Sequence, residues 1–208
     1  MIHVFHGFLG SPSDFDFLKT YPVKIHDLYQ MQELPAVSAE DTLIGYSMGG
    51  RIALEIAAKN DFDVKKLILI SAHPGLATDE EKFQRLEFET KVINELKNQK
   101  REAFLEWWNS LPIFHFDGPI NVSDERYQQS AELFERFRLS KQANFLPEIL
   151  KHKEKVLYIM GLFDEKYMDL ASEELIPHGI SVKGVAGGHR LHQHPEDLLK
   201  IFKDENVL

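Results

Sequence analysis

The chain has 208 residues, no cysteine and a formal net charge of −9 at pH 7. Its length fits one domain with its own core, and the lack of cysteine excludes disulfides, thiolate metal sites and a cysteine nucleophile. The acidic balance argues against a nucleic-acid partner, because such binding depends on basic surfaces. No apolar stretch approaches the roughly 20 residues of a membrane span, and Met1–Phe5 runs into a predicted strand instead of a signal sequence. We therefore expect a cytoplasmic protein with no membrane or nucleic-acid partner.

Short apolar runs alternate with segments of helical periodicity along much of the chain. This pattern predicts an α/β fold, with a parallel sheet of about six strands and helices on both faces. In such sheets the functional residues lie beyond the carboxyl ends of the strands. The predicted strands are Ile2–Phe5, Val23–His26, Thr42–Tyr46, Lys66–Ser71, Lys155–Met160 and Ser181–Val185.

Residues 77–153 are polar and charged and contain no good strand. A span of this length is not a plain loop in a compact domain, so we expect a helical lid inserted into a core formed by residues 1–76 and 154–208. Ser123 is a candidate N-cap for one of its helices. The predicted helices lie near Asp79–Gln99, Arg101–Trp108, Ser123–Arg138 and Asn144–His152.

The motif Gly-Tyr-Ser-Met-Gly at residues 45–49 lies between a predicted strand and the helix-forming run Arg51–Lys59. This context predicts a nucleophile elbow, a tight strand-to-helix turn that presents the Ser47 hydroxyl above the sheet. Glycine at Gly45 and Gly49 leaves room where the turn is tightest. The alternative is a glycine-rich turn in which Ser47 only caps a helix.

A serine nucleophile or base needs a histidine and an orienting carboxylate, and behind an elbow these follow in the order acid, then histidine. Asp164 follows the predicted strand that ends at Met160. His189 follows the last predicted strand and comes directly after Gly187 and Gly188, which allow a sharp loop. The alternative candidates for the two roles are His192, His194 and Glu165.

An oxyanion hole behind such an elbow uses two backbone amides, one from the residue after the serine and one from the loop after the first strand. These positions predict Met48 and Phe8 as the donors. His6 precedes the same loop, and we interpret it as a structural side chain that braces the loop.

Taken together, His6-Gly7-Phe8, the elbow, Asp164 and Gly188-His189 resemble the α/β-hydrolase superfamily over nearly the whole chain. Within it, Gly-Tyr-Ser-Met-Gly-Gly-Arg at residues 45–51 and Ser-Ala-His-Pro-Gly-Leu at residues 71–76 resemble the 2-succinyl-6-hydroxy-2,4-cyclohexadiene-1-carboxylate synthase (MenH-like) family of menaquinone biosynthesis. The resemblance implies the α/β-hydrolase fold, here with a reduced sheet because Ile2 already begins the first strand.

The resemblance also implies a lyase that uses the triad serine as a base to eliminate pyruvate from a cyclohexene with several carboxylates. Such a lyase is expected to need no cofactor and no metal, and its expected partner is a small anionic substrate. Arginine suits such a substrate because its fork binds a carboxylate through two hydrogen bonds. The substrate-binding residues that the resemblance implies are Tyr46, Arg51, Arg85, Trp108 and Arg138.

Two other functions remain open at this stage. The same triad serves a carboxylesterase or another serine acyl hydrolase, and a scaffold of this kind can also persist as a non-catalytic binding protein. From the residues alone, Arg85 and Arg138 are better interpreted as ordinary surface arginines. For Arg51 the binding role is the stronger interpretation, because it lies one helical turn from Ser47.

Overall fold

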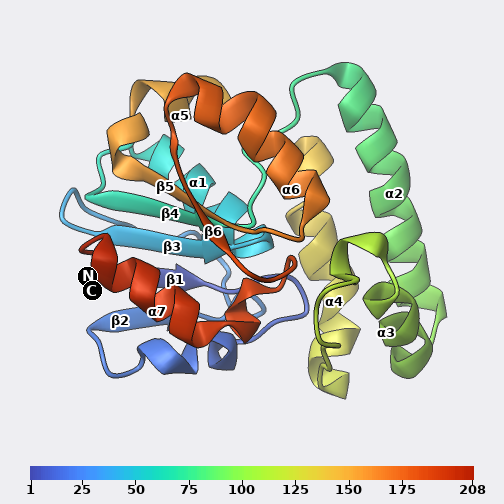
Figure 1. The fold of residues 1–208 in the computed structure, drawn as a ribbon. Helices are drawn as coiled ribbons and strands as arrows, with labels where there is room; N and C mark the ends of the chain where they lie inside the picture. The colour runs from blue at the N-terminus through green and yellow to red at the C-terminus, as the bar shows by residue number, and fades with distance from the viewer.

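The computed structural model describes residues 1–208. Six strands form one sheet in the order β2-β1-β3-β4-β5-β6, and every neighbouring pair is parallel. The predicted α/β fold with six parallel strands is therefore confirmed (Figure 1). The strands are β1 (Ile2–Phe5), β2 (Val23–His26), β3 (Thr42–Tyr46), β4 (Lys66–Ile70), β5 (Val156–Gly161) and β6 (Ser181–Val185).

Helices cover both faces of the sheet, because the central strands are apolar on both sides. Alternate residues of β3 divide between two cores, with Leu43 in one and Ile44 in the other. The first face is covered by α1 (Met48–Lys59), α5 (Leu146–Lys151) and α6 (Glu165–Leu170). The second face is covered by the 3-10 segment η1 (Pro12–Leu18) and by α7 (Pro195–Asp204).

Three strand boundaries differ by one residue from the prediction. β4 ends at Ile70, because Ser71 turns away with a φ of 44°. β5 begins at Val156 and runs to Gly161, because Lys155 belongs to the 3-10 turn η4 (Lys153–Lys155). No helix in the structure combines the length and apolarity that crossing a bilayer requires. The remaining short turns are η2 (Pro112–Phe114), η3 (Leu139–Lys141), η5 (Ala171–Leu175), η6 (Ile176–His178) and η7 (Leu191–Gln193).

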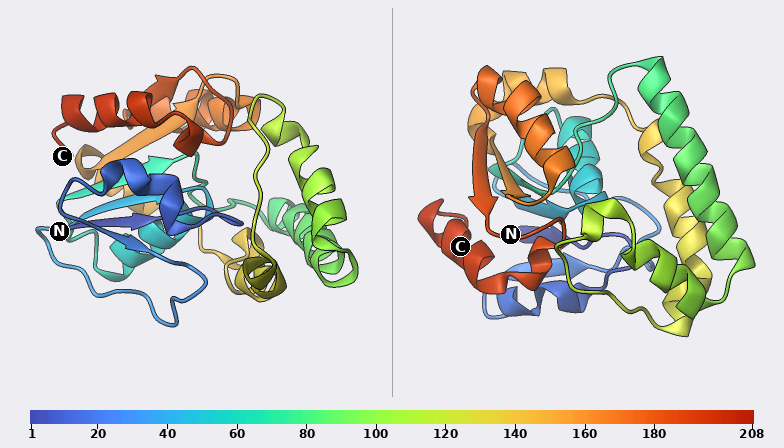
Figure 2. Two further views of the ribbon diagram at one scale, coloured as in Figure 1. Left: turned by 90° about the horizontal axis from the view of Figure 1, so that it is seen from below. Right: turned by 45° about the vertical axis from the view of Figure 1, so that its right-hand side comes forward.

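Three helices of the insertion project beyond the carboxyl ends of the strands (Figures 1 and 2). They are α2 (Asp79–Asn98), α3 (Arg101–Asn109) and α4 (Asp124–Arg136), and we call residues 79–136 the cap. Ser123 caps α4 as expected, since its Oγ accepts the Arg126 N–H at 3.4 Å. Unlike the cap, α5 lies beside the sheet (Figure 1), because the chain returns to the core where the Phe145 N–H donates to the Pro74 carbonyl. We propose that the chain divides into a core and a lid, as the sequence predicts for residues 77–153, but with α5 in the core.

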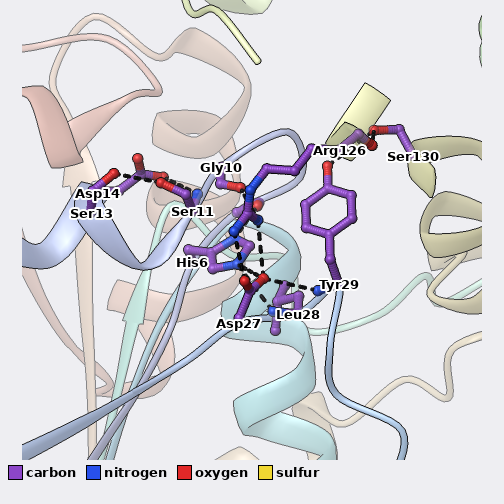
Figure 3. Close-up of polar contacts among 11 residues, drawn as sticks. His6, Gly10, Ser11, Ser13, Asp14, Asp27, Leu28, Tyr29, Arg126 and Ser130 are labelled. Carbon is purple, nitrogen blue, oxygen red and sulfur yellow. Dashed lines mark hydrogen bonds and ion pairs between the residues drawn. The ribbon is translucent and has the colours of Figure 1, made fainter. Parts of the chain in front are cut away.

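One arginine of the cap, Arg126, anchors it to Asp27, which directly follows β2, and to Gly10 in the loop after β1. Arg126 donates through Nη1 to Asp27 Oδ1 at 3.0 Å and through Nη2 to Asp27 Oδ2 at 2.6 Å (Figure 3). Its Nη1 also donates to the Gly10 carbonyl at 3.3 Å, and the guanidinium lies 4.9 Å from the centre of the Tyr29 ring. Because Gly10 belongs to the loop after β1, Arg126 also joins the cap to one of the loops that surround Ser47.

We expect the Arg126–Asp27 pair to contribute measurably to stability, because two-point geometry strengthens an ion pair that is only partly exposed. A double-mutant cycle with Arg126→Ala and Asp27→Ala should give a coupling free energy of about 1–2 kcal/mol in urea unfolding. The same cycle on Lys200 and Asp204, an exposed pair at 2.7 Å, serves as the control and should give below about 0.5 kcal/mol. Equal coupling free energies for the two pairs would contradict the expectation that the Arg126–Asp27 pair stabilises the attachment of the cap.

Candidate active site

Ser47 occupies a strained turn between β3 and α1. Its φ is 52° and its ψ is −112°, a conformation that costs a non-glycine residue on the order of 1–3 kcal/mol. The Ser47 N–H donates to the Ile70 carbonyl at 2.8 Å, which ties the turn to β4. A Cβ on Gly49 would lie 2.3 Å from the carbonyl oxygens of Phe5 and His6, so only glycine permits this approach to β1. The sequence thus builds the strained turn of a nucleophile elbow.

Ser47, His189 and Asp164 form one hydrogen-bonded chain. The His189 Nδ1–H donates to Asp164 Oδ2 at 2.6 Å, which leaves the Nε2 lone pair facing Ser47 Oγ at 3.1 Å. The histidine and the aspartate are 3% and 2% exposed. Asp164 Oδ1 is buried without a protein partner, so the imidazole is the only hydrogen-bond donor to this carboxylate. In this arrangement His189 can accept the serine proton, and Asp164 can stabilise the imidazolium that results.

The alternative residues lie elsewhere. His192 packs against the Tyr46 ring at 5.0 Å, and burial is the largest cause of its lowered pKa. His194 lies 3.9 Å from Asp197 near the start of α7. Glu165 is exposed at the start of α6. None of the three makes a hydrogen bond to Ser47 or to His189.

The predicted oxyanion amides have no acceptor within the protein. Met48 is the first residue of α1, where an N–H group has no intrahelical partner, and the Phe8 N–H donates to no backbone or side-chain acceptor. The loop of Phe8 is braced by His6, whose Nδ1–H donates to the Gly7 carbonyl at 2.8 Å while its Nε2 accepts the Leu28 N–H at 3.1 Å. Both amides are therefore free to bind negative charge on a ligand.

Two cavities meet at Ser47 and His189. The larger has a volume of about 700 Å³ and the smaller about 220 Å³. Trp108 and Phe114 of the cap line both of them, so the cap supplies the wall above the serine. A ligand that spans the two cavities would pass directly over the Ser47 hydroxyl.

The larger cavity is lined by three cations, Arg51, Arg85 and Lys166, and by the carboxylates of Glu81, Asp164 and Glu165. The buried Arg51 donates through Nη1 to the Phe137 carbonyl at 2.8 Å and forms no ion pair. Desolvation, and after it the charge of Arg85, lowers the pKa of Arg51 to about 10. Arg85 also lines this cavity, and its Nε donates to the buried Glu89 at 2.8 Å. Arg138 lines neither cavity and instead pairs with Glu135.

Tyr46 and Trp108 also lie beside the serine. The Tyr46 ring is buried below the smaller cavity, 5.7 Å from the His189 ring, and burial raises its pKa well above the usual value. Trp108 is held in an aromatic cluster by edge contacts with Phe8 at 5.4 Å and Phe134 at 6.5 Å. The structure thus places four of the five predicted substrate-binding residues around the cavities, with Arg138 as the exception.

Lys166 is a site residue that the sequence analysis missed. It lies in the first turn of α6, two residues after Asp164, lines the larger cavity and pairs with no carboxylate. The residue is exposed as a whole, yet desolvation and the neighbouring Arg85 lower its pKa. Its position directly after the predicted acid was a signal that could have identified it.

His73 was missed as well, although it follows β4 at the edge of the sheet where Ser47 lies. Its Nδ1 accepts the Gly75 N–H at 3.1 Å, so the proton of the neutral ring is on Nε2. Burial, and after it Lys166 and Arg85, lowers its pKa to about 4, which keeps the ring neutral near pH 7. His73 therefore lines the larger cavity as an uncharged hydrogen-bond donor.

Nothing in the structure has the arrangement of a metal site, since no three His, Asp or Glu side chains gather as ligands.

Comparison with known proteins agrees with the fold and with the resemblance. No protein-family model matches the chain. It is 25% identical to a 2-succinyl-6-hydroxy-2,4-cyclohexadiene-1-carboxylate synthase of Pectobacterium atrosepticum, over 90% of this chain and 86% of that protein. Other relatives described by this synthase name are matched over 54% to 61% of their own length.

Among solved structures, MenH from S. aureus superposes with a TM-score of 0.75 at 23% identity, covering 99% of this chain and 94% of that one. A carboxylesterase of Nitrososphaera gargenis superposes with a TM-score of 0.62 at 15% identity, covering 99% and 89%. Both likenesses concern the fold. The chain therefore has the α/β-hydrolase fold, and its sequence is similar to those of 2-succinyl-6-hydroxy-2,4-cyclohexadiene-1-carboxylate synthases.

Proposed function

We propose that this protein is a cytoplasmic, cofactor-free lyase of menaquinone biosynthesis that eliminates pyruvate from a polycarboxylated cyclohexene. The observation that carries the proposal is the position of Ser47. Its hydroxyl is hydrogen-bonded to His189 and lies beside a cavity lined by Arg51, Arg85 and Lys166. The similarity to the synthases supports the same conclusion.

The proposed reaction begins when His189 takes the proton of Ser47, with Asp164 stabilising the imidazolium. The serine oxygen then removes a proton from a ring carbon next to a carbonyl group. The amides of Phe8 and Met48 bind the negative charge that develops on that carbonyl oxygen. The electron pair moves through the ring double bond and breaks the carbon–oxygen bond to the enolpyruvyl group. Protonation of the departing enolpyruvate gives pyruvate, and no covalent link to Ser47 forms.

Carboxylesterase activity is the second candidate, and the superposition on a carboxylesterase fold supports it. Here Ser47 attacks an ester carbonyl, and the same two amides bind the oxyanion. The two functions are separated by incubating the protein with the synthase substrate and, in parallel, with a p-nitrophenyl ester. We expect pyruvate release at a rate well above ester hydrolysis. Rapid ester turnover without pyruvate would favour the esterase.

Replacing Ser47 with alanine should lower turnover of the true substrate by at least about a thousandfold, since triad members act as a unit. The measurement is the initial rate of pyruvate release, with a thermal melt to show that the variant is folded. We expect the melt to be unchanged or higher, because alanine removes only a hydroxyl. Undiminished turnover in the variant would show that Ser47 does not act in the reaction. No activity of the wild type on any substrate would leave the non-catalytic binding protein as the remaining interpretation.

Lys166 should contribute to binding of an anionic substrate, because it is the cavity cation whose amino group has no hydrogen-bond or ion-pair partner in the protein. Lys166→Met is expected to lower kcat/KM for the carboxylated substrate about tenfold, or about 1.4 kcal/mol, and to change turnover of a neutral ester less than about twofold. Lys97→Met, in the last turn of α2, is the matched surface control. Equal losses on the charged and neutral substrates would assign Lys166 a structural role instead.

A further inference from the structure

The cap contacts the backbone of the loop that carries His189. The carboxylate of Asp117, in the segment between α3 and α4, accepts the His189 N–H on Oδ2 and the Arg190 N–H on Oδ1, each at 3.0 Å. The two segments run side by side although more than 70 positions separate them in the sequence (Figure 2). One side chain of the cap therefore binds two consecutive amides of the histidine loop.

The fit between the two segments depends on glycine. A Cβ on Gly188 would lie 2.6 Å from Asp117 Oδ1, so any larger residue would push the carboxylate away. His189 and Arg190 are buried, and their amides have no other acceptor in the protein. Because a buried N–H without a partner costs about 1–3 kcal/mol, loss of Asp117 would favour a different backbone conformation of this loop.

A second group of contacts joins the same two segments without involving His189. Gly118 forms a paired interaction with the Gln193 side chain, in which its N–H donates to Oε1 at 2.9 Å and its carbonyl accepts from Nε2 at 3.0 Å. Arg190 Nη1 donates to the same carbonyl at 2.7 Å. These contacts hold the cap segment in place. Removing them tests the effect of a looser cap segment separately from the effect of losing the contact with His189.

We propose that Asp117 is a positioning residue for His189. Asp164 fixes the imidazole ring through Nδ1, while Asp117 fixes the backbone from which the ring extends, and the two constraints together hold Nε2 at 3.1 Å from Ser47 Oγ. Asp117 itself touches neither the substrate cavities nor the serine. The consequence is that the triad is aligned only while Asp117 is bound to the two amides of the histidine loop. The inference rests on the proposed role of Ser47 and His189 in chemistry.

The test compares Asp117→Asn and Asp117→Ala with Gln193→Ala. Asparagine keeps one acceptor oxygen but turns an NH₂ group toward the second amide, so it disrupts the contact with little change in volume. The main readout is the rate at which a fluorophosphonate probe labels Ser47, which reports activation of the serine whatever the natural substrate is. We expect both Asp117 variants to label at least tenfold more slowly than the wild type, and Gln193→Ala to label within about threefold of it.

A second readout is the low-field proton resonance of the hydrogen bond between His189 and Asp164, which needs no activity. It should shift or broaden in Asp117→Asn and stay in place in Gln193→Ala. Thermal melts show whether each variant is folded. Wild-type labelling rates and an unmoved resonance in folded Asp117→Asn would overturn the proposal, as would equal losses in Asp117→Asn and Gln193→Ala. Failure of the proposed function would give a different result. The probe would then label the wild type no faster than Ser47→Ala, while the proton resonance would still show whether Asp117 positions His189.

Discussion

The arrangement of the site depends on the backbone of Ser47. A residue with a φ of 52° reverses the chain between β3 and α1, and this lifts the hydroxyl above the carboxyl edge of the sheet. All six strands are parallel, so the loops that carry Phe8, Asp164 and His189 emerge at this same edge. The strain is held by neighbours on both sides, with Gly49 against β1 and the Ser47 amide bound to β4. The fold thus brings together residues that are far apart in the sequence.

Much of this architecture could be predicted because its signals are local. Buried five-residue runs such as Thr42–Tyr46 indicate strands, and the elbow motif fixes where the serine lies along the chain. The order of serine, acid and histidine then narrows the choice of partners. Discrimination among His189, His192 and His194 required coordinates, because the direction of each imidazole depends on loop geometry. The capping box formed by Thr78 and Glu81 was a local signal for the start of α2 that the sequence analysis did not use.

The positions of the cations around the larger cavity were less predictable, because a charged side chain has competing partners. Glu135, in the last turn of α4, pairs with Arg138 just after that helix, so this arginine is bound away from the cavities. Arg85 has Glu89 one turn later, but Glu89 also accepts from Leu139 and Ser140, and Arg85 still reaches the cavity. The sequence contains these spacings but not the direction in which each side chain points. Lys166 was missed for the same reason.

The cap is part of the active-site geometry and not only its cover. It supplies Trp108 and Phe114 to both cavities, and its two polar anchors each reach a loop that surrounds Ser47. Arg126 binds the carbonyl of Gly10 in the loop that carries the Phe8 amide, and Asp117 binds the amide of His189. The Phe8 amide and His189 thus lie on separate core loops that the cap connects. Their relative position therefore depends on contacts that the sheet alone cannot supply, so helices distant in sequence from Ser47 belong to the same structural unit as the proposed triad.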